Sequence, residues 1–194
     1  MSSNFIYLSL TLVLAVSTDC PAIIALAQGL HMNTTQPLIW SELQNDCCIA
    51  ATGITCLADR VTQIAWQSKS LDGIILSGLF PNTLTDFDVS SNSLTGNVPV
   101  FPSSLENLKL GYNSFSGSIP SPLPSSLKQF IVSQNGFTGS LPAYPVGLTN
   151  IDVSNNQFSG NIPSPLPSTV NSAYFVNNQF TGSIPSPVPP GMIL

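Results

Sequence analysis

From Val61 onward, the hydrophobic positions of the chain recur in units of 21 to 23 residues. The units begin at Val61, Leu84, Leu105, Leu127, Leu148 and Val170. In each unit, the residues three and five positions after the first are apolar and the residue between them points the other way. This alternation predicts a short strand with one buried and one exposed face. A fixed period with matched columns indicates a solenoid, in which stacked units bury one continuous core.

Further columns follow the predicted strand. An asparagine column consists of Asn92, Asn113, Asn135, Asn156 and Asn178, whose amides can bond backbone groups of the turn and of the neighbouring unit. A column of leucine and phenylalanine comes next and is predicted to fill the interior, and a glycine column then permits positive φ. Five units continue with an apolar residue and a proline, which predicts extended or polyproline segments rather than helix on the back of each unit.

The N-terminal region predicts a secretory signal over residues 1–17. An apolar run from Phe5 to Val16 leads into Ser17, and Ala15 and Ser17 are small residues at the two positions that a signal peptidase inspects. This run is short of the ~20 apolar residues that a membrane-spanning helix needs. We therefore expect a removed signal, with an uncleaved anchor as the alternative, and no later segment approaches transmembrane length.

All four cysteines lie before the repeats, at Cys20, Cys47, Cys48 and Cys56. An even number of clustered cysteines is typical of disulfides in a secreted chain, whereas a metal site would need a CxxC-type spacing that the adjacent pair does not supply. A bridge between the adjacent cysteines would be strained, which leaves two of the three connectivities open. The triplet that begins at Asn33 is a glycosylation sequon, so Asn33 is a predicted glycosylation site in a secreted chain.

The charge content excludes several classes of protein. Only 7% of the residues are charged, against about 25% in an average soluble domain, and the net charge is −5. Four basic residues cannot form the patch that phosphate binding needs, so nucleic acid is not an expected partner. With a single histidine, His31, and few ionisable groups to tune, we expect no enzyme, no catalytic residue, no metal site and no cofactor. Asp86 and Asp88 share one strand face, but nothing nearby would bury one carboxylate, which favours a solvated acidic spot over a glycosidase pair.

The segments that begin at Leu105 and Leu148 read LENLKLGYNSFSGSIP and LTNIDVSNNQFSGNIP. This pattern resembles plant-type extracellular leucine-rich repeats. The preceding region has an apolar helix over residues 21–32, then Trp40, the Cys-Cys pair and the segment that ends at Cys56. It resembles the N-terminal cap of polygalacturonase-inhibiting proteins and of the ectodomains of leucine-rich-repeat receptor-like kinases. The resemblance implies the disulfides Cys20–Cys47 and Cys48–Cys56.

Together these features predict a leucine-rich-repeat solenoid, a curved right-handed superhelix of the α/β type. We expect a parallel β-sheet on its concave face, mostly coil and polyproline on its convex face, and a helical, disulfide-stapled N-terminal cap. The expected organisation is a signal peptide over 1–17, the cap over 18–60, six repeats over 61–189 and a short tail over 190–194. No second cysteine cluster follows the last unit. We therefore expect residues 192–194 to fold back as a minimal cap, the open end to self-associate, or the chain to be a truncated relative of a longer receptor.

The outward-facing strand positions and the residues just after the strands are the predicted recognition surface. The candidates are Asp86, Asp88, Lys109, Tyr112, Ile131, Gln134, Asp152 and Tyr174. Aromatic and apolar anchors among them are typical of interfaces. We therefore expect a non-enzymatic, secreted or extracellular recognition module that binds a protein, a peptide or a glycan through the concave sheet. The alternatives are a truncated ectodomain of a cell-surface receptor and a structural protein of the wall or matrix.

Overall fold

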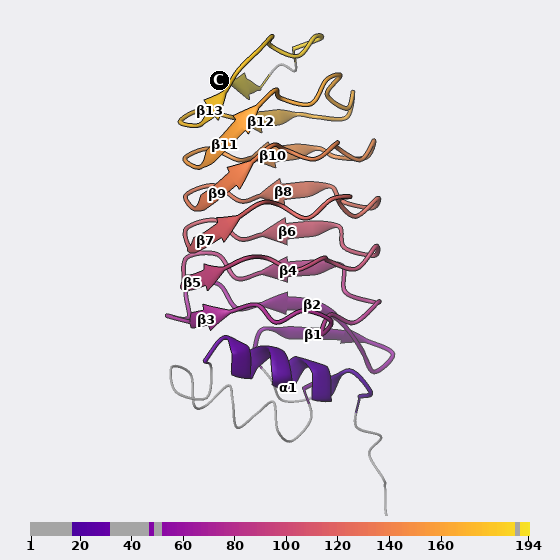
Figure 1. Ribbon diagram of the computed structural model, residues 1–194. Helices are drawn as coiled ribbons and strands as arrows, with labels where there is room; N and C mark the ends of the chain where they lie inside the picture. The colour runs from indigo at the N-terminus through magenta and orange to yellow at the C-terminus, as the bar shows by residue number, and fades with distance from the viewer. Residues whose placement is uncertain (1–16, 32–46, 49–51, 189–190) are drawn as a thin grey trace, which may run out of the picture.

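The computed structural model describes residues 17–31, 47–48, 52–188 and 191–194. Two parallel sheets run the length of a stack of units, and one helix, α1 (Cys20–Gly29), covers the N-terminal end (Figure 1). The predicted signal peptide up to residue 16 and the sequon at Asn33 lie outside the described residues. Ser17, at the end of the predicted signal, is buried beside α1, and its carbonyl accepts a hydrogen bond from the backbone N–H of Cys20.

The larger sheet contains the strand that the sequence predicts in each unit. Its order is β1 (Ile54–Leu57), β2 (Arg60–Ala65), β4 (Asp86–Asp88), β6 (Asn107–Lys109), β8 (Gln129–Ile131), β10 (Asn150–Asp152), β12 (Ser172–Tyr174) and β14 (Met192–Ile193). β2 to β14 are parallel, and β1 runs antiparallel to β2. Inward side chains such as Phe87 and Phe130 are fully buried, while the residues on either side of them are half-buried, so the predicted alternation is confirmed.

A second parallel sheet follows the asparagine column, and the sequence analysis did not anticipate it. It contains β3 (Asp72–Ile74), β5 (Ser93–Gly96), β7 (Ser114–Gly117), β9 (Gly136–Gly139), β11 (Gln157–Gly160) and β13 (Gln179–Phe180). Strands of two to four residues are too short to show an alternation in sequence. Most of them end at a glycine with positive φ. At Gly117, where φ is 74°, a Cβ would lie 2.3 Å from Oδ1 of Asn97.

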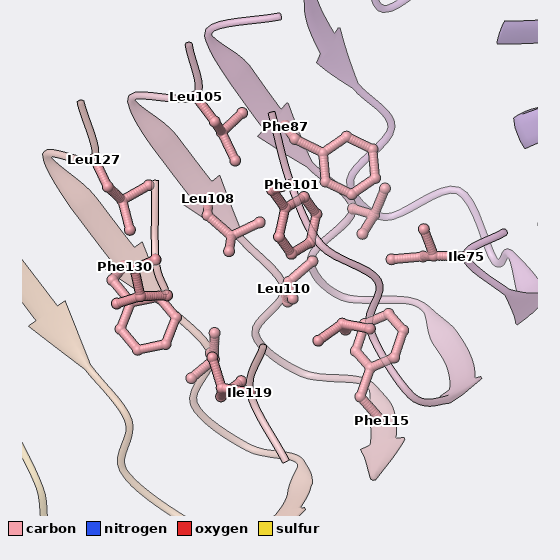
Figure 2. Packing of buried hydrophobic residues seen from close by; sticks show 14 of the residues in the cluster. Ile75, Phe87, Phe101, Leu105, Leu108, Leu110, Phe115, Ile119, Leu127 and Phe130 are labelled. Carbon is pink, nitrogen blue, oxygen red and sulfur yellow. The ribbon is translucent and has the colours of Figure 1, made fainter. Parts of the chain in front are cut away.

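The phenylalanine column forms a stack inside the second sheet. Phe115, Phe137, Phe158 and Phe180 follow one another with ring centroids 6.0, 6.0 and 6.3 Å apart and interplanar angles of 15°, 14° and 9°. Leucines and phenylalanines of the first sheet belong to the same buried cluster as this stack, and Figure 2 shows several of them together with Phe115. One buried cluster therefore extends from the cap to the last repeat, as expected for stacked units that share a core.

The convex side contains no helix in the described repeats, which agrees with the proline-rich sequence there. A proline begins the turn into β4, β6, β8, β10 and β12, and its carbonyl accepts a hydrogen bond from the N–H three residues later at 3.0–3.1 Å. These prolines are Pro81, Pro102, Pro124, Pro145 and Pro167. The sequence analysis did not identify this proline column, because the spacing between the preceding apolar–Pro pair and the turn varies by one residue between units.

Tyr144 breaks an otherwise apolar column on the convex side. Phe80, Phe101, Leu123 and Leu166 occupy the same place in other units. The Tyr144 hydroxyl is buried without a hydrogen-bond partner in the described part of the chain, and this burial raises the pKa of Tyr144. A buried, unpaired hydroxyl costs free energy that an apolar ring does not.

We therefore expect Tyr144→Phe to stabilise the protein by about 1 kcal/mol at neutral pH. The unfolded state loses the hydroxyl proton near pH 10, before the folded state does, so the wild type should lose stability as the pH rises above about 10. The advantage of the variant should grow over the same range. Urea denaturation at pH 7 and pH 10.5, compared between the two proteins, measures both effects. A variant that is less stable than wild type at pH 7 would contradict the assignment of an unpaired hydroxyl.

The asparagine column lies at the turn between the two sheets, and each of its side chains connects its own unit with the preceding one. Asn156, which is buried, accepts a hydrogen bond at Oδ1 from the backbone N–H of Phe137 at 3.1 Å. Its Nδ2 donates to the carbonyls of Val132 at 3.0 Å and Val153 at 3.1 Å. Asn92, Asn113, Asn135 and Asn178 make corresponding bonds. The asparagines thus pair backbone groups that a buried turn would leave without partners.

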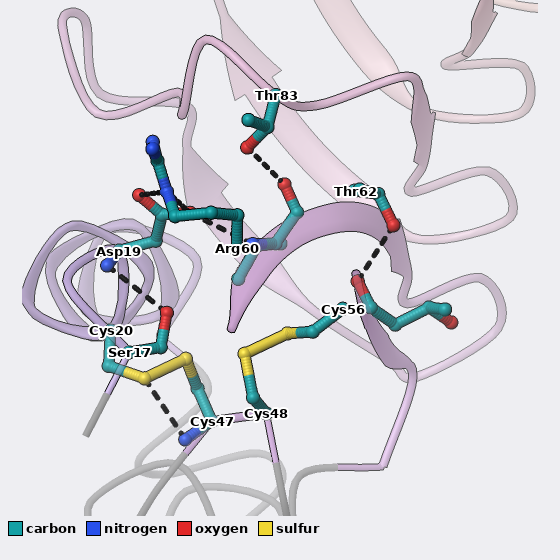
Figure 3. The surroundings of a disulfide bond; sticks show 11 residues. Ser17, Asp19, Cys20, Cys47, Cys48, Cys56, Arg60, Thr62 and Thr83 are labelled. Atoms are coloured by element: carbon teal, nitrogen blue, oxygen red, sulfur yellow. Dashed lines mark hydrogen bonds and ion pairs between the residues drawn. A yellow bond between two sulfur atoms is a disulfide. The ribbon is translucent and has the colours of Figure 1, made fainter. Parts of the chain in front are cut away.

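Two disulfides hold the cap, with the pairing that the family resemblance implies. Cys20 is bonded to Cys47 and Cys48 to Cys56, with Cα–Cα distances of 5.5 and 5.6 Å (Figure 3). Asp19, at the N-terminus of α1, joins the cap to β2. The N–H at Nε of Arg60 donates to both oxygens of the Asp19 carboxylate, at 3.1 Å for Oδ1 and 3.0 Å for Oδ2, and the backbone N–H of Val61 donates to Oδ2 at 2.8 Å. The hydrogen bond between Arg60 and Asp19 and the negative charge of Asp19 raise the pKa of Arg60.

Helix α1 ends at Gly29, earlier than the predicted end at Met32. The N–H of Leu30 still bonds to the Leu26 carbonyl, but His31 takes a left-handed backbone with a φ of 50°, which ends the helix. A Cβ at Gly29 would lie 2.9 Å from the carbonyl oxygen of Ile74, so the helix approaches the repeats closely at this point. The ring of His31 then contacts Asp72 of β3, with 2.9 Å between Nδ1 and Oδ1.

At the C-terminal end, residues 192–193 extend the larger sheet instead of folding back over it. Met192 of β14 pairs with Ala173, and Ile193 pairs with Tyr174. The N–H of Phe175 bonds to the carbonyl of Ile193 at 2.8 Å. The short segment therefore satisfies backbone groups of β12, and the side chain of Ile193 is itself half-exposed.

Candidate functional site

Five of the predicted residues form one row across the larger sheet. Strand pairing places side by side, in order, Asp88, Lys109, Ile131, Asp152 and Tyr174. All five lie on the outward face of the sheet, which we call the concave face. Because adjacent strands are about 4.8 Å apart, the row presents five side chains of four kinds over roughly 20 Å. It contains two negative charges, one positive charge and two apolar groups, a mixture that suits recognition better than it suits catalysis.

A parallel row lies two residues earlier on each strand. It consists of Gln63, Asp86, Asn107, Gln129, Asn150 and Ser172. Neighbouring side chains in it bond to one another: Nδ2 of Asn107 donates to Oδ1 of Asp86 at 2.6 Å, and Nδ2 of Asn150 donates to Oγ of Ser172 at 2.9 Å. These bonds restrict the rotamers of the row, so the surface is ordered before a ligand arrives.

The aspartates of the first row are held by serines that the sequence analysis did not single out. Oδ1 of Asp88 accepts hydrogen bonds from Oγ of Ser90 at 2.6 Å and from its N–H at 3.0 Å. Asp152 has the same two bonds with Ser154, at 2.6 and 3.1 Å. The tripeptide Asp-Val-Ser at both places was the available signal. One carboxylate oxygen of each aspartate is thus engaged, and the other has no hydrogen-bond partner among the described residues.

A shallow hollow of about 200 Å³ lies at the N-terminal end of the two rows. Asp86, Asp88 and Lys109 line it together with Gln63 and Gln67. Gln67 was missed because it follows the predicted strand rather than lying on it. Within the described residues, the three ion pairs are His31–Asp72, Arg60–Asp19 and Lys128–Glu106, so Lys109 keeps its charge available although Asp88 is its cross-strand neighbour.

The other two predicted residues, Tyr112 and Gln134, are not part of the row. They lie at the turn just before the asparagine column and have a left-handed backbone, each with a φ of 56°. Tyr112 is 62% exposed, compared with 37% for Tyr174 in the row. Strand alternation does not extend into the turn, which is why the sequence could not separate these two residues from the concave face.

Among the described residues, no group of three or more histidine, cysteine or acidic side chains is placed to hold a metal ion. No helix in that part of the chain combines the length and the apolar character needed to cross a membrane.

Comparisons with known proteins agree with this architecture. The Leucine Rich Repeat family model matches residues 104–125 and 147–168, and a search of curated protein sequences finds no significant match. The leucine-rich-repeat ectodomain of the receptor kinase SOBIR1 from Arabidopsis thaliana is 28% identical with a TM-score of 0.72, covering 84% of this chain and 95% of that chain. Pollen Receptor Kinase 3 is 25% identical with a TM-score of 0.64, over 77% of this chain and 86% of that chain.

A third solved structure shares the fold at lower identity. It is the ectodomain of GASSHO1/SCHENGEN3 from Arabidopsis thaliana, in complex with CASPARIAN STRIP INTEGRITY FACTOR 2. It is 21% identical with a TM-score of 0.63, and the match covers 86% of this chain and 25% of that chain. Stacked parallel strands, an asparagine column and a disulfide-linked helical cap define a leucine-rich-repeat protein. The chain contains such repeats and is similar to the leucine-rich-repeat ectodomains of plant receptor kinases.

Proposed function

We propose that this protein is an extracellular or cell-surface recognition module, without enzymatic activity, that binds a protein or peptide ligand on its concave face. The observation that carries the proposal is the row from Asp88 to Tyr174, which aligns charged, apolar and aromatic side chains across five parallel strands. Arginine- or lysine-bearing ligands can pair with the carboxylates of the two aspartates. A ligand carboxylate can pair with Lys109, and apolar ligand groups can pack on Ile131 and Tyr174.

The solved neighbours support a recognition role of this kind. The SOBIR1 structure is the ectodomain of a receptor kinase, and the GASSHO1/SCHENGEN3 ectodomain was solved in complex with CASPARIAN STRIP INTEGRITY FACTOR 2. The match with SOBIR1 extends over 95% of that ectodomain, which favours a second candidate function: the ligand-binding ectodomain of a membrane receptor. Mapping the 3′ end of the transcript separates the two, since a reading frame that continues into a membrane span would favour the receptor.

The concave face can be tested with a displayed library of random peptides selected on the folded wild-type protein. We expect the double variant Lys109→Ala with Tyr174→Ala to weaken binding of the selected peptides by about tenfold or more, because two contacts of the row are lost. The matched control is Thr138→Ala with Gln179→Ala, which removes two exposed side chains of the second sheet. Neither double variant should change the melting temperature. Peptides that bind both double variants equally well would place recognition outside the concave face.

A further inference from the structure

A second hollow, of about 500 Å³, lies away from the concave row, at the turn where the larger sheet passes into the second sheet. It spans three successive units. Of its lining residues, Ser114 belongs to the first of these units, Gln134 and Gly136 to the second, and Asn155 and Gln157 to the third. Three of these belong to the second sheet, as the first residues of β7, β9 and β11. The hollow is therefore a property of neighbouring units rather than of one loop.

Gly136 opens this hollow. The residue that follows the asparagine column is Ser93, Ser114, Gln157 or Gln179 in other units, and only this unit of the five has glycine. The backbone conformation does not require glycine at this position, because the φ of Gly136 is not positive. A Cβ there would lie 3.1 Å from the Phe115 carbonyl oxygen and 3.9 Å from Nε2 of Gln157. A side chain at this position would therefore enter the hollow.

The lining of this hollow is polar and uncharged, and several of its polar side chains make no hydrogen bond within the described residues. Within the described residues, no hydrogen bond involves the side chain of Ser114, Ser116, Gln134 or Gln157, and all four residues are exposed. Amides and hydroxyls each offer a donor and an acceptor. Phe115 is the one apolar residue of the lining, and its side chain is fully buried.

We propose that this hollow binds a neutral, extended oligosaccharide. A sugar presents hydroxyl groups that donate and accept, and these complement amide and hydroxyl side chains without any charge. Equivalent side chains of adjacent units recur at the strand spacing of about 4.8 Å, which is close to the length of one pyranose residue in an extended chain. The net charge of −5 disfavours an acidic glycan.

A peptide fits this hollow less well. Its side chains would need apolar pockets or charged partners, and the lining supplies neither. Tyr112 adds a feature that favours a sugar. It occupies the column of Gln134 one unit earlier, and the residue is 62% exposed. The N–H of Asn113, the next residue, donates to the Gln134 carbonyl at 3.2 Å. An exposed aromatic ring beside amides can stack on the apolar face of a pyranose.

The experiment measures binding of cellohexaose to the intact protein by isothermal titration calorimetry, with maltohexaose and a hexameric oligogalacturonate as probes of linkage and charge. We expect cellohexaose to bind and the acidic hexamer not to bind. Gly136→Gln, which places in the hollow the side chain found at Gln157, should weaken cellohexaose binding by about tenfold or more. The control Ser93→Gln adds the same side chain at the same place in a unit outside the hollow and should bind as wild type does.

A second pair of variants keeps the proposal testable should Gly136→Gln not fold. Gln134→Ala with Gln157→Ala removes two lining amides without adding volume, and it should weaken binding, whereas Gln179→Ala should not. Failure of both neutral hexamers to bind would overturn the proposal, as would unchanged cellohexaose affinity in folded Gly136→Gln. If peptides selected on the wild type lose binding in Gly136→Gln and keep it in the Lys109 and Tyr174 variant, the hollow is a peptide site and the proposal is wrong. The concave-face proposal is independent of the sugar results.

Discussion

Replacing Phe137 with alanine is expected to lower the free energy of unfolding by about 3–5 kcal/mol. The ring is fully buried and stacks between Phe115 and Phe158, with both centroid distances 6.0 Å. Its removal leaves a cavity between two rings that are held by their own backbone strands, so the neighbours cannot collapse into the space. The transfer cost and the cavity cost therefore add.

Urea denaturation of the disulfide-intact protein, followed by far-UV circular dichroism, measures this loss. Phe180→Ala is the matched control, because Phe180 ends the same stack, has a ring on one side only within it, and is half-buried. We expect the control to cost clearly less than Phe137→Ala. Equal losses at the two positions would show that stacking from both sides does not add to the stability of the column.

Asn156→Asp is expected to destabilise the protein by about 3 kcal/mol or more at neutral pH, although the two side chains have almost the same shape. Nδ2 of Asn156 donates to the carbonyls of Val132 and Val153, and Oδ1 accepts from the N–H of Phe137. A carboxylate keeps the acceptor but replaces the donor with a second negative oxygen that faces carbonyl oxygens. The site is buried, so water cannot compensate for the lost donor.

The loss should decrease as the pH falls, because protonation of the introduced carboxyl removes its charge and restores one donor. Denaturation midpoints at pH 7 and pH 4 therefore test the mechanism as well as the size of the effect. The control Gln157→Glu adds the same charge at the next residue, which is exposed. A comparable loss in both variants would mean that added charge, rather than the missing donor, is responsible.

The sequence by itself determined the repeating part of the fold. Its columns specify which side chains point inward, because a buried strand position must be apolar in every unit, and the structure confirms this at Phe87 and Phe130. Once strands of equal length stack in register, outward residues at the same place in each unit must align, so the row from Asp88 to Tyr174 could also be predicted. The disulfide pairing followed from the family resemblance, since four cysteines alone leave alternatives.

Only the tertiary structure decided features that depend on neighbouring units or on very short segments. The second sheet consists of strands of two to four residues, which carry no alternation, and their pairing partners lie about one repeat away. The structure places Ser90 in the site, because its hydroxyl bonds to Asp88. It places Tyr112 outside the row, at a turn with a left-handed backbone. The hollow at Gly136 depends on a missing side chain, and a glycine in one column has no visible consequence until the flanking units are placed beside it.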